Sequence, residues 1–354
     1  MTKKNIIISA GGTGGHIFSA LAVTKELQAY YNIIWVGGKT GLENKLVPEH
    51  NIPLFTVSIL GVRNKGIIRK LLLPLMMLRA LYECIKIILK VKPVAVIGFG
   101  GYAAFPICLS AKLLGKKIVI HEQNSVIGLT NKLIGKFANK IITAFPNVSN
   151  STNTVMLGNP VRHEITAVYN KDKYLDTSKL RVLIVGGSLG AKVLNEIVPQ
   201  SLGLIKHKIH SVTHQVGRGD IESTANLYKQ SAMVDNVNVV NFIQDMAAAF
   251  IDHDIIICRS GASTVAEVAC AGIVPIFVPY PFAVDDHQTT NAKYLVDNQA
   301  GYLLSQNKLN IDSLSELIAS LNKNILREMS EKLYNLAKIN STTMIVEEIR
   351  KIVN

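Results

Sequence analysis

The chain has 354 residues, of which 48% are hydrophobic and 18% are charged. That length has room for two domains of ordinary size, and the composition excludes a disordered or collagen-like chain. The four cysteines lie far apart and include no C-x-x-C pair. A disulfide framework or a structural zinc site is therefore not expected, and a reducing cytosol fits.

The formal net charge of +13 is concentrated in one half of the chain. Residues 1–158 contain 19 Lys and Arg against 5 Asp and Glu, a net charge of +14, whereas residues 159–354 contain 19 against 20, a net charge of −1. The basic half should attract an anionic partner, such as a membrane surface, a phosphorylated substrate or nucleic acid. Nucleic acid is not expected, because aromatic residues make up only 6% and the sequence has no nucleic-acid-binding motif.

Short β-branched runs alternate with longer helical patterns along the chain, which predicts the doubly wound α/β class with parallel sheets. The predicted strands are Asn5–Ala10, Ile33–Gly37, Val94–Gly98, Lys117–His121, Arg181–Gly187, Val237–Ile243, Asp254–Cys258 and Val274–Pro279. The predicted helices include Phe18–Tyr30, Gly128–Phe137, Asp245–Ile251 and Thr264–Ala271.

The first strand leads into the glycine loop GGTGGH, residues Gly11–His16. Bare glycine amides at a helix N-terminus bind phosphate without a metal, although a tight strand–helix turn also favours glycine. His16 closes this loop, where an imidazole that titrates near neutral pH suits general acid–base catalysis. A packing or capping role is the alternative for His16.

The stretch Arg63–Lys92 contains eight basic residues and one acidic residue among many apolar ones. Its charges are too frequent for a membrane-spanning helix. An apolar face ringed by Lys and Arg fits contact with an anionic membrane surface, which we favour over an ordinary core helix with a solvated basic face. The predicted membrane patch consists of Ile67, Ile68, Arg69, Lys70, Leu71, Leu72, Leu75, Met76 and Arg79.

A second glycine cluster, Gly98–Ala103, fits the pattern G-x-G-x-x-A, and Glu122 follows about 20 residues later. This is the spacing of a dinucleotide-binding fingerprint, so an NAD-dependent oxidoreductase is a rival interpretation. Two observations oppose it: the unit does not open the domain, and Pro106 interrupts the expected helix.

Four polar side chains, His121, Glu122, Gln123 and Asn124, end a buried strand. Buried polar groups need partners, so the cluster predicts a ligand site, with a solvated loop as the alternative. Glu122 is a candidate base, and Asn124 is a candidate ligand for a sugar hydroxyl or an amide.

The strand and glycine-loop pattern restarts at Arg181–Gly187, which leads into GGSLGA, residues Gly186–Ala191. Two such openings predict two Rossmann-like domains that face one interdomain cleft, because ligands bind beyond the carboxyl ends of parallel strands. Ser188 is a candidate phosphate ligand and also a candidate cap of the following helix.

The domain boundary is expected after Gly158-Asn159-Pro160. We therefore predict domains at residues 1–160 and 161–340. The final helical stretch, Glu331–Val353, fits either domain, and its last part, about residues 340–354, is assigned to the first.

Small residues follow the strand Asp254–Cys258 and suit a diphosphate at a helix N-terminus. Glu267 fits a bidentate contact with ribose hydroxyls. Thr264 and Glu267 also have the spacing of a capping box, and the sequence leaves these two interpretations equal.

Gln288 and Asn291 are three residues apart and share a helix face, which suits sugar hydroxyls. Asp285 and Asp286 resemble a metal site only weakly, because acidic residues at a helix start are expected from the helix dipole. The sequence has no D-x-D at a strand end, so no bound metal is expected.

Taken together, these motifs resemble the MurG family of peptidoglycan glycosyltransferases over essentially the whole chain. The matching stretches are GGTGGH, GFGGYAAFP (98–106), HEQNSVIGLTNK (121–132), GNPVR (158–162), VGGSLGAK (185–192), FIQDMAAAF (242–250), CRSGASTVAEVACAG (258–272) and VPYPFAVDDHQTTNA (278–292). Two residues depart from the family pattern: Ser19 replaces a usual Pro, and Leu189 replaces a usual Gln.

The resemblance implies a GT-B fold whose first half binds a lipid acceptor and whose second half binds a UDP-sugar. It implies that Ile243 meets uracil through its backbone, that Glu267 meets the ribose, and that Gln288 and Asn291 hold sugar hydroxyls. The implied acceptor-site residues are Gly100, Gly101 and Tyr102. The implied donor-site residues are Thr13, Gly14, Gly15, Asn124, Arg162, Ser188, Ile243, Ala262, Ser263, Thr264, Val265, Ala266, Glu267, Gln288 and Asn291.

The implied reaction is an inverting transfer of N-acetylglucosamine from UDP-N-acetylglucosamine to the C4 hydroxyl of undecaprenyl-linked muramyl-pentapeptide. Because His16 and Glu122 are expected at adjacent strand ends, we expect one of them to be the base. No cofactor is expected. The expected partners are the two substrates, an anionic membrane surface and other cell-wall synthesis proteins, at the cytoplasmic face of the bacterial plasma membrane. The alternatives are a UDP-sugar 2-epimerase of the same fold, an NAD-dependent oxidoreductase and a non-catalytic UDP-sugar sensor.

Overall fold

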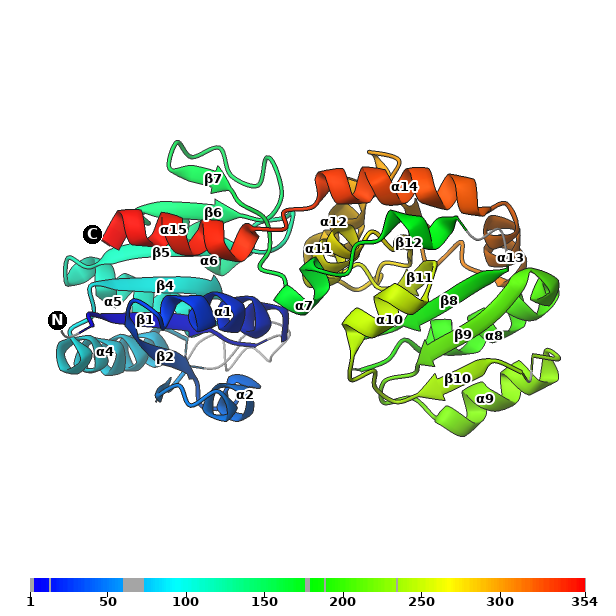
Figure 1. Cartoon of the computed structure of the whole chain (residues 1–354). Helices are drawn as coiled ribbons and strands as arrows, with labels where there is room; N and C mark the ends of the chain where they lie inside the picture. The colour runs from blue at the N-terminus through cyan, green and yellow to red at the C-terminus, as the bar shows by residue number, and fades with distance from the viewer. Residues whose placement is uncertain are drawn as a thin grey trace. The chain divides into compact units, whose positions relative to one another are not determined.

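The computed structural model describes residues 3–12, 14–59, 73–175, 179–187, 189–233 and 235–353. The chain divides into two compact units (Figure 1). Unit 1 comprises Met1–Pro160 together with Asn340–Asn354, and unit 2 comprises Val161–Ile339.

The described strands of unit 1 form one parallel sheet in the order β3-β2-β1-β4-β5-β6-β7. Their bounds are β1 (Asn5–Ala10), β2 (Asn32–Gly38), β3 (Leu54–Val57), β4 (Ala95–Gly100), β5 (Lys117–Glu122), β6 (Lys140–Thr143) and β7 (Thr154–Met156). The helices are α1 (Gly14–Leu27), α2 (Glu43–Glu49), α4 (Leu73–Val91), α5 (Ala104–Leu113), α6 (Leu129–Gly135) and α15 (Ser341–Val353).

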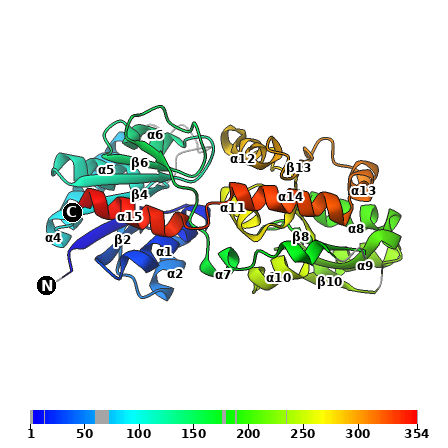
Figure 2. The same cartoon turned by 45° about the horizontal axis from the view of Figure 1, so that its top comes forward.

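Both faces of this sheet are buried, because successive strand residues point to opposite faces. Ile6 and Ile8 pack in the core layer that α1 and α15 cover, and Ile7 packs in the layer that α4 and α5 cover. The helix α15 lies beside α1 (Figures 1 and 2).

The predicted final helical stretch is two helices and not one. The helix α14 (Lys323–Leu336) ends in unit 2, and α15 begins five residues later in unit 1. Ile345, Val346 and Ile349 of α15 are buried in the core of unit 1.

The described strands of unit 2 form a second parallel sheet in the order β10-β9-β8-β11-β12-β13. Their bounds are β8 (Leu180–Val185), β9 (Ile209–Gln215), β10 (Val237–Val240), β11 (Ile255–Cys258), β12 (Val274–Phe277) and β13 (Tyr302–Leu303). The α-helices are α7 (His163–Thr166), α8 (Lys192–Leu204), α9 (Ile221–Gln230), α10 (Met246–Asp252), α11 (Ala262–Ala271), α12 (His287–Val296), α13 (Ile311–Ala319) and α14. Short 3-10 helices are η1 (Lys171–Tyr174), η2 (Lys206–Lys208) and η3 (Val284–Asp286).

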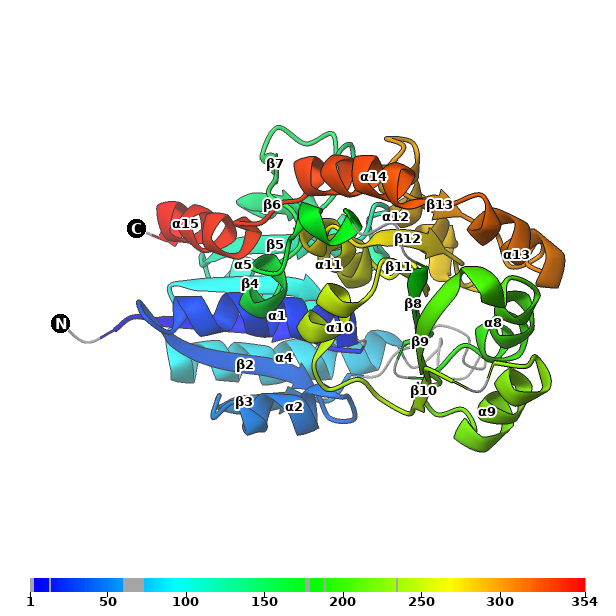
Figure 3. The ribbon, with the colours of Figure 1, turned by 45° about the vertical axis from the view of Figure 1, so that its right-hand side comes forward.

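The helices α8 and α9 lie side by side next to the strands β8 to β10 (Figure 3).

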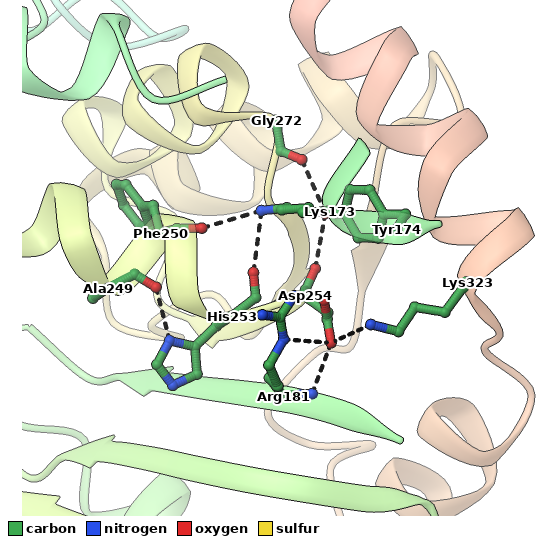
Figure 4. Close-up of polar contacts among 9 residues, drawn as sticks. All are labelled: Lys173, Tyr174, Arg181, Ala249, Phe250, His253, Asp254, Gly272 and Lys323. Carbon is green, nitrogen blue, oxygen red and sulfur yellow. Dashed lines mark hydrogen bonds and ion pairs between the residues drawn. The ribbon is translucent and has the colours of Figure 1, made fainter. Parts of the chain in front are cut away.

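A buried polar cluster lies at the amino end of the central strands of unit 2 and joins several elements (Figure 4). The carboxylate of Asp254 contacts Arg181 at 2.7 Å and Lys323 at 2.8 Å. Burial raises the pKa of Asp254, but these two cations outweigh that effect and hold the pKa below its ordinary value. This cluster fixes the start of β8 and the start of α14 to the start of β11.

The doubly wound α/β prediction is confirmed, with shifted element bounds. The eight predicted strands all form, and the Val237–Ile243 strand ends early, at Val240. The structure adds the unpredicted strands β3, β6, β7, β9 and β13. The helix α5 begins at Ala104, so Pro106 lies in its first turn, where proline is tolerated, and the expectation that Pro106 interrupts the helix is wrong. Among the described residues, none of the helices combines the length and apolar character that a membrane span requires.

Candidate functional site

In unit 1 the glycine segments that begin at Gly11 and at Gly98 lie together at the carboxyl edge of the sheet. The strands β1 and β4 are neighbours, with Ala10 paired to Gly100, so the segments that follow them meet. Gly101 has φ +89°, and a Cβ there would lie 2.4 Å from the carbonyl oxygen of Gly11. Only glycine permits this approach.

His16 lies in the first turn of α1, and its ring packs on the backbone of Gly100. A Cβ on Gly100, which has φ +103°, would lie 2.7 Å from His16 Nε2. The helix α1 begins at Gly14, four residues before the predicted start, so Gly14, Gly15 and His16 are helical residues and their amides belong to the helix N-terminus. The side chain of Tyr102 is partly exposed next to this glycine segment.

Glu122 ends β5 and organises the loop that follows. Its Oε1 accepts hydrogen bonds from the backbone N–H and the Nδ2 of Asn124, at 3.0 and 3.4 Å. Its Oε2 accepts from the backbone N–H of Gly128 at 3.0 Å and from Asn131 Nδ2 at 2.9 Å. Burial raises the pKa of Glu122 although these four donors act in the opposite direction.

The neighbours of Glu122 on the strand are also buried. His121 Nε2 donates to the carbonyl oxygen of Gly158 at 3.1 Å, and burial lowers the pKa of His121 to about 4, so the ring is neutral at pH 7. Gln123 packs against Gly15, where a Cβ would lie 3.2 Å from its Nε2. The alternative of a solvated loop does not hold for His121, Glu122 and Gln123, each of which is more than nine-tenths buried.

In unit 2 the helix α11 begins directly after Gly261, with its first turn at the carboxyl edge of β11. Glu267 lies in the second turn, and its Oε1 is 3.1 Å from Arg162 Nη2. The capping-box interpretation of Thr264 and Glu267 is wrong, because the N-cap residue is Gly261 and it has no side-chain cap. Burial raises the pKa of Glu267, and the Arg162 guanidinium partly offsets this.

The two amides predicted for the sugar are tied to neighbouring backbone. Gln288 Oε1 accepts from the backbone N–H of Tyr280 at 2.9 Å, and the buried Asn291 donates from Nδ2 to the carbonyl oxygen of Ser260 at 3.3 Å. Asp286 is the N-cap residue of α12 but makes no side-chain hydrogen bond to the backbone of the first turn; its carboxylate accepts instead from the hydroxyl of Thr289 at 2.7 Å.

The segment after β10 contains Ile243, and its backbone is held by a residue that the sequence did not single out. Gln215, the last residue of β9, accepts from the backbone N–H of Ile243 at 2.9 Å. The strand β9 reads IHSVTHQ, which is too polar for the apolar patterns used to predict strands. A polar residue that ends a strand beside a glycine loop is the signal that would have found Gln215.

Some predicted site residues fall outside the described residues, namely Thr13, Ser188 and the membrane-patch residues Ile67, Ile68, Arg69, Lys70, Leu71 and Leu72. Of the two departures from the family pattern, Leu189 is largely exposed and Ser19 is buried in α1. In the part of the chain that is described, no three His, Cys, Asp or Glu side chains gather in an arrangement that could hold a metal ion.

Comparison with known proteins identifies the family. Residues 6–143 match the glycosyltransferase family 28 N-terminal domain, and residues 181–349 match the C-terminal domain of the same family. A protein of Cupriavidus metallidurans is 42% identical over 98% of both chains, and one of Dechloromonas aromatica is 44% identical over 98% of both. Both carry the name UDP-N-acetylglucosamine–N-acetylmuramyl-(pentapeptide) pyrophosphoryl-undecaprenol N-acetylglucosamine transferase. The crystal structure of Acinetobacter baumannii MurG superposes with a TM-score of 0.88 at 41% identity and covers 98% of this chain and 99% of that one.

The chain belongs to the MurG family of glycosyltransferases. The fold is therefore GT-B, and the chain is a glycosyltransferase, as its resemblance to the MurG family implied. A UDP-N-acetylglucosamine 2-epimerase is also similar, with a TM-score of 0.67 at 15% identity, a level at which the likeness extends to the fold alone. Membership of the MurG family thus favours glycosyl transfer over epimerisation and over NAD-dependent oxidation.

Proposed function

We propose that this protein transfers N-acetylglucosamine from UDP-N-acetylglucosamine to the C4 hydroxyl of the muramyl sugar in undecaprenyl-pyrophosphoryl-muramyl-pentapeptide, a step of peptidoglycan synthesis. The names of the MurG relatives support these substrates. The observation that carries the proposal is that strands of both sheets lead, at their carboxyl edges, into helix starts made of glycine or other small residues: β1 into α1, and β11 into α11. Such amides suit pyrophosphate groups, and each substrate carries one.

The donor would bind in unit 2. The amides at the start of α11 would face the diphosphate, and the carboxylate of Glu267 would accept hydrogen bonds from the ribose hydroxyls. The backbone of Ile243 would meet the uracil, and Gln288 and Asn291 would face the sugar. Preorganised amides would stabilise the charge that develops on the departing UDP, so we expect neither a cofactor nor a bound metal.

For the base that deprotonates the acceptor hydroxyl we favour His16 over Glu122. Both oxygens of Glu122 already accept two hydrogen bonds each within its own loop, which suits a structural role. His16 lies at the N-terminus of α1 beside Gly100, at the edge where the acceptor would bind. A base must come within about 3 Å of the proton it removes, and an imidazole there would activate the hydroxyl for attack with inversion at the anomeric carbon.

The helix α4 supports peripheral contact with a membrane surface, and we propose that this surface is the cytoplasmic face of the bacterial inner membrane. Leu75, Leu78 and Tyr82 are each more than half exposed on α4, and they recur at helical spacing along one side. Arg79 and Lys86 are exposed on the same helix. Exposed apolar side chains flanked by cations suit contact with anionic lipid, where the enzyme would meet its lipid-linked acceptor.

The proposal is tested by measuring release of UDP from UDP-N-acetylglucosamine with and without the lipid-linked acceptor in anionic vesicles. We expect release only when the acceptor is present, and no release with a lipid that lacks the muramyl sugar. Acceptor-independent formation of UDP-N-acetylmannosamine would favour the epimerase, and tight UDP-sugar binding without turnover would favour the sensor.

A further inference from the structure

Gln215 occupies the point in unit 2 where the segments after two different strands come together. It ends β9, and β9 lies between β8 and β10 in the sheet. The strand β8 leads into the glycine loop GGSLGA, and β10 leads into the segment that contains Ile243. The side chain of Gln215 is only 3% exposed, so its carboxamide must find its partners within the protein.

The two ends of the carboxamide contact the two segments. Gln215 Oε1 accepts from the backbone N–H of Ile243 at 2.9 Å, and Gln215 Nε2 donates to the carbonyl oxygen of Gly187 at 3.4 Å. The orientation of the amide is determined by its partners, because a backbone N–H can only donate and a carbonyl oxygen can only accept. One buried side chain therefore bridges residues 187 and 243.

The helix α10, which follows Ile243, is held independently at its other end (Figure 4). Lys173 Nζ donates to the carbonyl oxygens of Phe250 and His253, at 3.1 Å each. The His253 ring donates from Nδ1 to the carbonyl oxygen of Ala249 at 2.7 Å, and its Nε2 accepts from the hydroxyl of Thr213 on β9 at 2.9 Å. These contacts fix the end of α10, and the backbone N–H of Gly217 donates to the carbonyl oxygen of Asn241 at 3.1 Å, two residues before Ile243. Between these two fixed points, Gln215 supplies a hydrogen bond to the Ile243 N–H itself.

We propose that Gln215 is a positioning residue for uracil recognition: it holds the Ile243 N–H and thereby directs the Ile243 carbonyl to accept from N3–H of the base. This inference rests on the proposed function, in which the Ile243 backbone meets uracil. A carbonyl at this position selects a base with a donor at N3, as uracil has, over cytosine, whose N3 is an acceptor. Through Gly187, the same side chain also sets the glycine loop relative to the base.

The test is nucleotide selectivity, because general damage to unit 2 would weaken all nucleotides alike. Two sets of quantities are measured for the full chain and for three Gln215 variants. The first is the dissociation constants of UDP and CDP, and the second is KM and kcat for UDP-N-acetylglucosamine. Gln215→Met keeps the side-chain length but loses both hydrogen bonds. Gln215→Asn keeps the amide but shortens its reach, and Gln215→Glu keeps an acceptor for the Ile243 N–H while losing the donor to Gly187. Gln200→Met is the matched control, because Gln200 is a partly exposed residue of α8 whose amide donates to the carbonyl oxygen of Glu196 on the same helix.

We expect Gln215→Met and Gln215→Asn to raise KM and the dissociation constant of UDP about tenfold and to lower the preference for UDP over CDP by a similar factor, with kcat changed less than twofold. Gln215→Glu should recover most of the preference, and Gln200→Met should match the unmodified protein. An unchanged ratio of UDP to CDP affinity in folded Gln215 variants would overturn the inference, as would tighter UDP binding, which would mean that Gln215 competes with the base. If the unmodified protein binds no UDP at all, the proposed function fails instead.

Discussion

Arg162 and Glu267 form an ion pair across 105 residues of sequence, with 3.1 Å between Arg162 Nη2 and Glu267 Oε1. Arg162 is the N-cap residue of α7, at the start of unit 2, and Glu267 lies on α11. Burial raises the pKa of the Glu267 carboxyl, and the Arg162 guanidinium opposes that rise. In the proposed donor site, Arg162 would therefore act through Glu267.

This pair predicts how donor binding depends on pH. Burial raises the pKa of Glu267 and Arg162 opposes that shift, so Arg162→Met should raise the pKa further. A protonated Glu267 loses acceptor capacity for ribose hydroxyls, and KM for UDP-N-acetylglucosamine should therefore increase as the pH falls. The increase should begin at a higher pH in Arg162→Met than in the unmodified protein. Steady-state kinetics between pH 5.5 and 8.5 measure this, and identical KM profiles would contradict it.

His214 predicts a pH dependence of folding stability. Its ring lies buried between the hydroxyl of Tyr228 at 3.0 Å and Asn195 Oδ1 at 3.1 Å, and burial lowers its pKa to about 3. Because the pKa in the unfolded chain is near 6.5, the unfolded state takes up a proton first as the pH falls. The stability from this neutral ring is fully present above about pH 6.5 and is lost toward pH 3, by up to about 1.4 kcal/mol per pH unit.

Denaturant unfolding at pH 7, 6 and 5 checks this contribution. The variant His214→Gln keeps a donor and an acceptor but cannot titrate, so its free energy of unfolding should fall less steeply over this range. Equal slopes for the two proteins would show that the ring does not stay neutral in the folded state.

The approach of the two glycine segments in unit 1 predicts a strong effect of Gly101→Ala. Alanine is unfavourable at the φ of +89° that residue 101 adopts, and its Cβ would also lie only 2.4 Å from the carbonyl oxygen of Gly11. Gly115 is the matched control, because its φ is +66° but no other atom lies within 4 Å of the place that a Cβ would take there. We expect Gly115→Ala to cost about 1 kcal/mol of unfolding free energy and Gly101→Ala to cost more and to reduce transfer at least tenfold. Equal melting temperatures and activities for the two variants would refute the close packing.

The exposed face of α4 predicts lipid binding that is separable from catalysis. Leu78, which is 65% exposed, would lose contact with lipid in the variant Leu78→Glu, and the new charge would be repelled by anionic lipid. Sedimentation with anionic vesicles should fall at least fivefold, while transfer to a soluble acceptor analogue stays unchanged. Leu204→Glu, at the end of α8 in unit 2 and also exposed, is the control and should sediment normally. Normal sedimentation of Leu78→Glu would exclude α4 as the contact surface.

The sequence was most informative where one local signal determined the structure. β-branched runs with apolar residues on both faces, such as Asn5–Ala10, found the central strands, because burial on both faces dictates that composition. The strand β9 was missed, since its alternation of polar and apolar residues includes buried polar residues, His214 and Gln215, that are satisfied by distant partners.

Contacts between distant residues could not be predicted from local patterns. The spacing of Thr264 and Glu267 suggested a capping box, yet the true partner of Glu267 is Arg162, which only the packing of α7 against α11 brings near. The role of Glu122 likewise depends on Asn131, nine residues away on α6. Sequence patterns therefore located the candidate site residues, whereas the hydrogen bonds that decide between a catalytic and a structural role required the fold.

The central claim is sugar transfer to a lipid-linked acceptor, and the fate of a labelled sugar tests it most directly. Purified protein is incubated with UDP-N-acetylglucosamine labelled in the sugar and with undecaprenyl-pyrophosphoryl-muramyl-pentapeptide in anionic vesicles, and the label is then partitioned between water and lipid. The account predicts label in the lipid phase, bound to the muramyl sugar in a β-linkage, with one UDP released per sugar transferred. Label that stays entirely in the aqueous phase, with an active relative as the positive control, would contradict it.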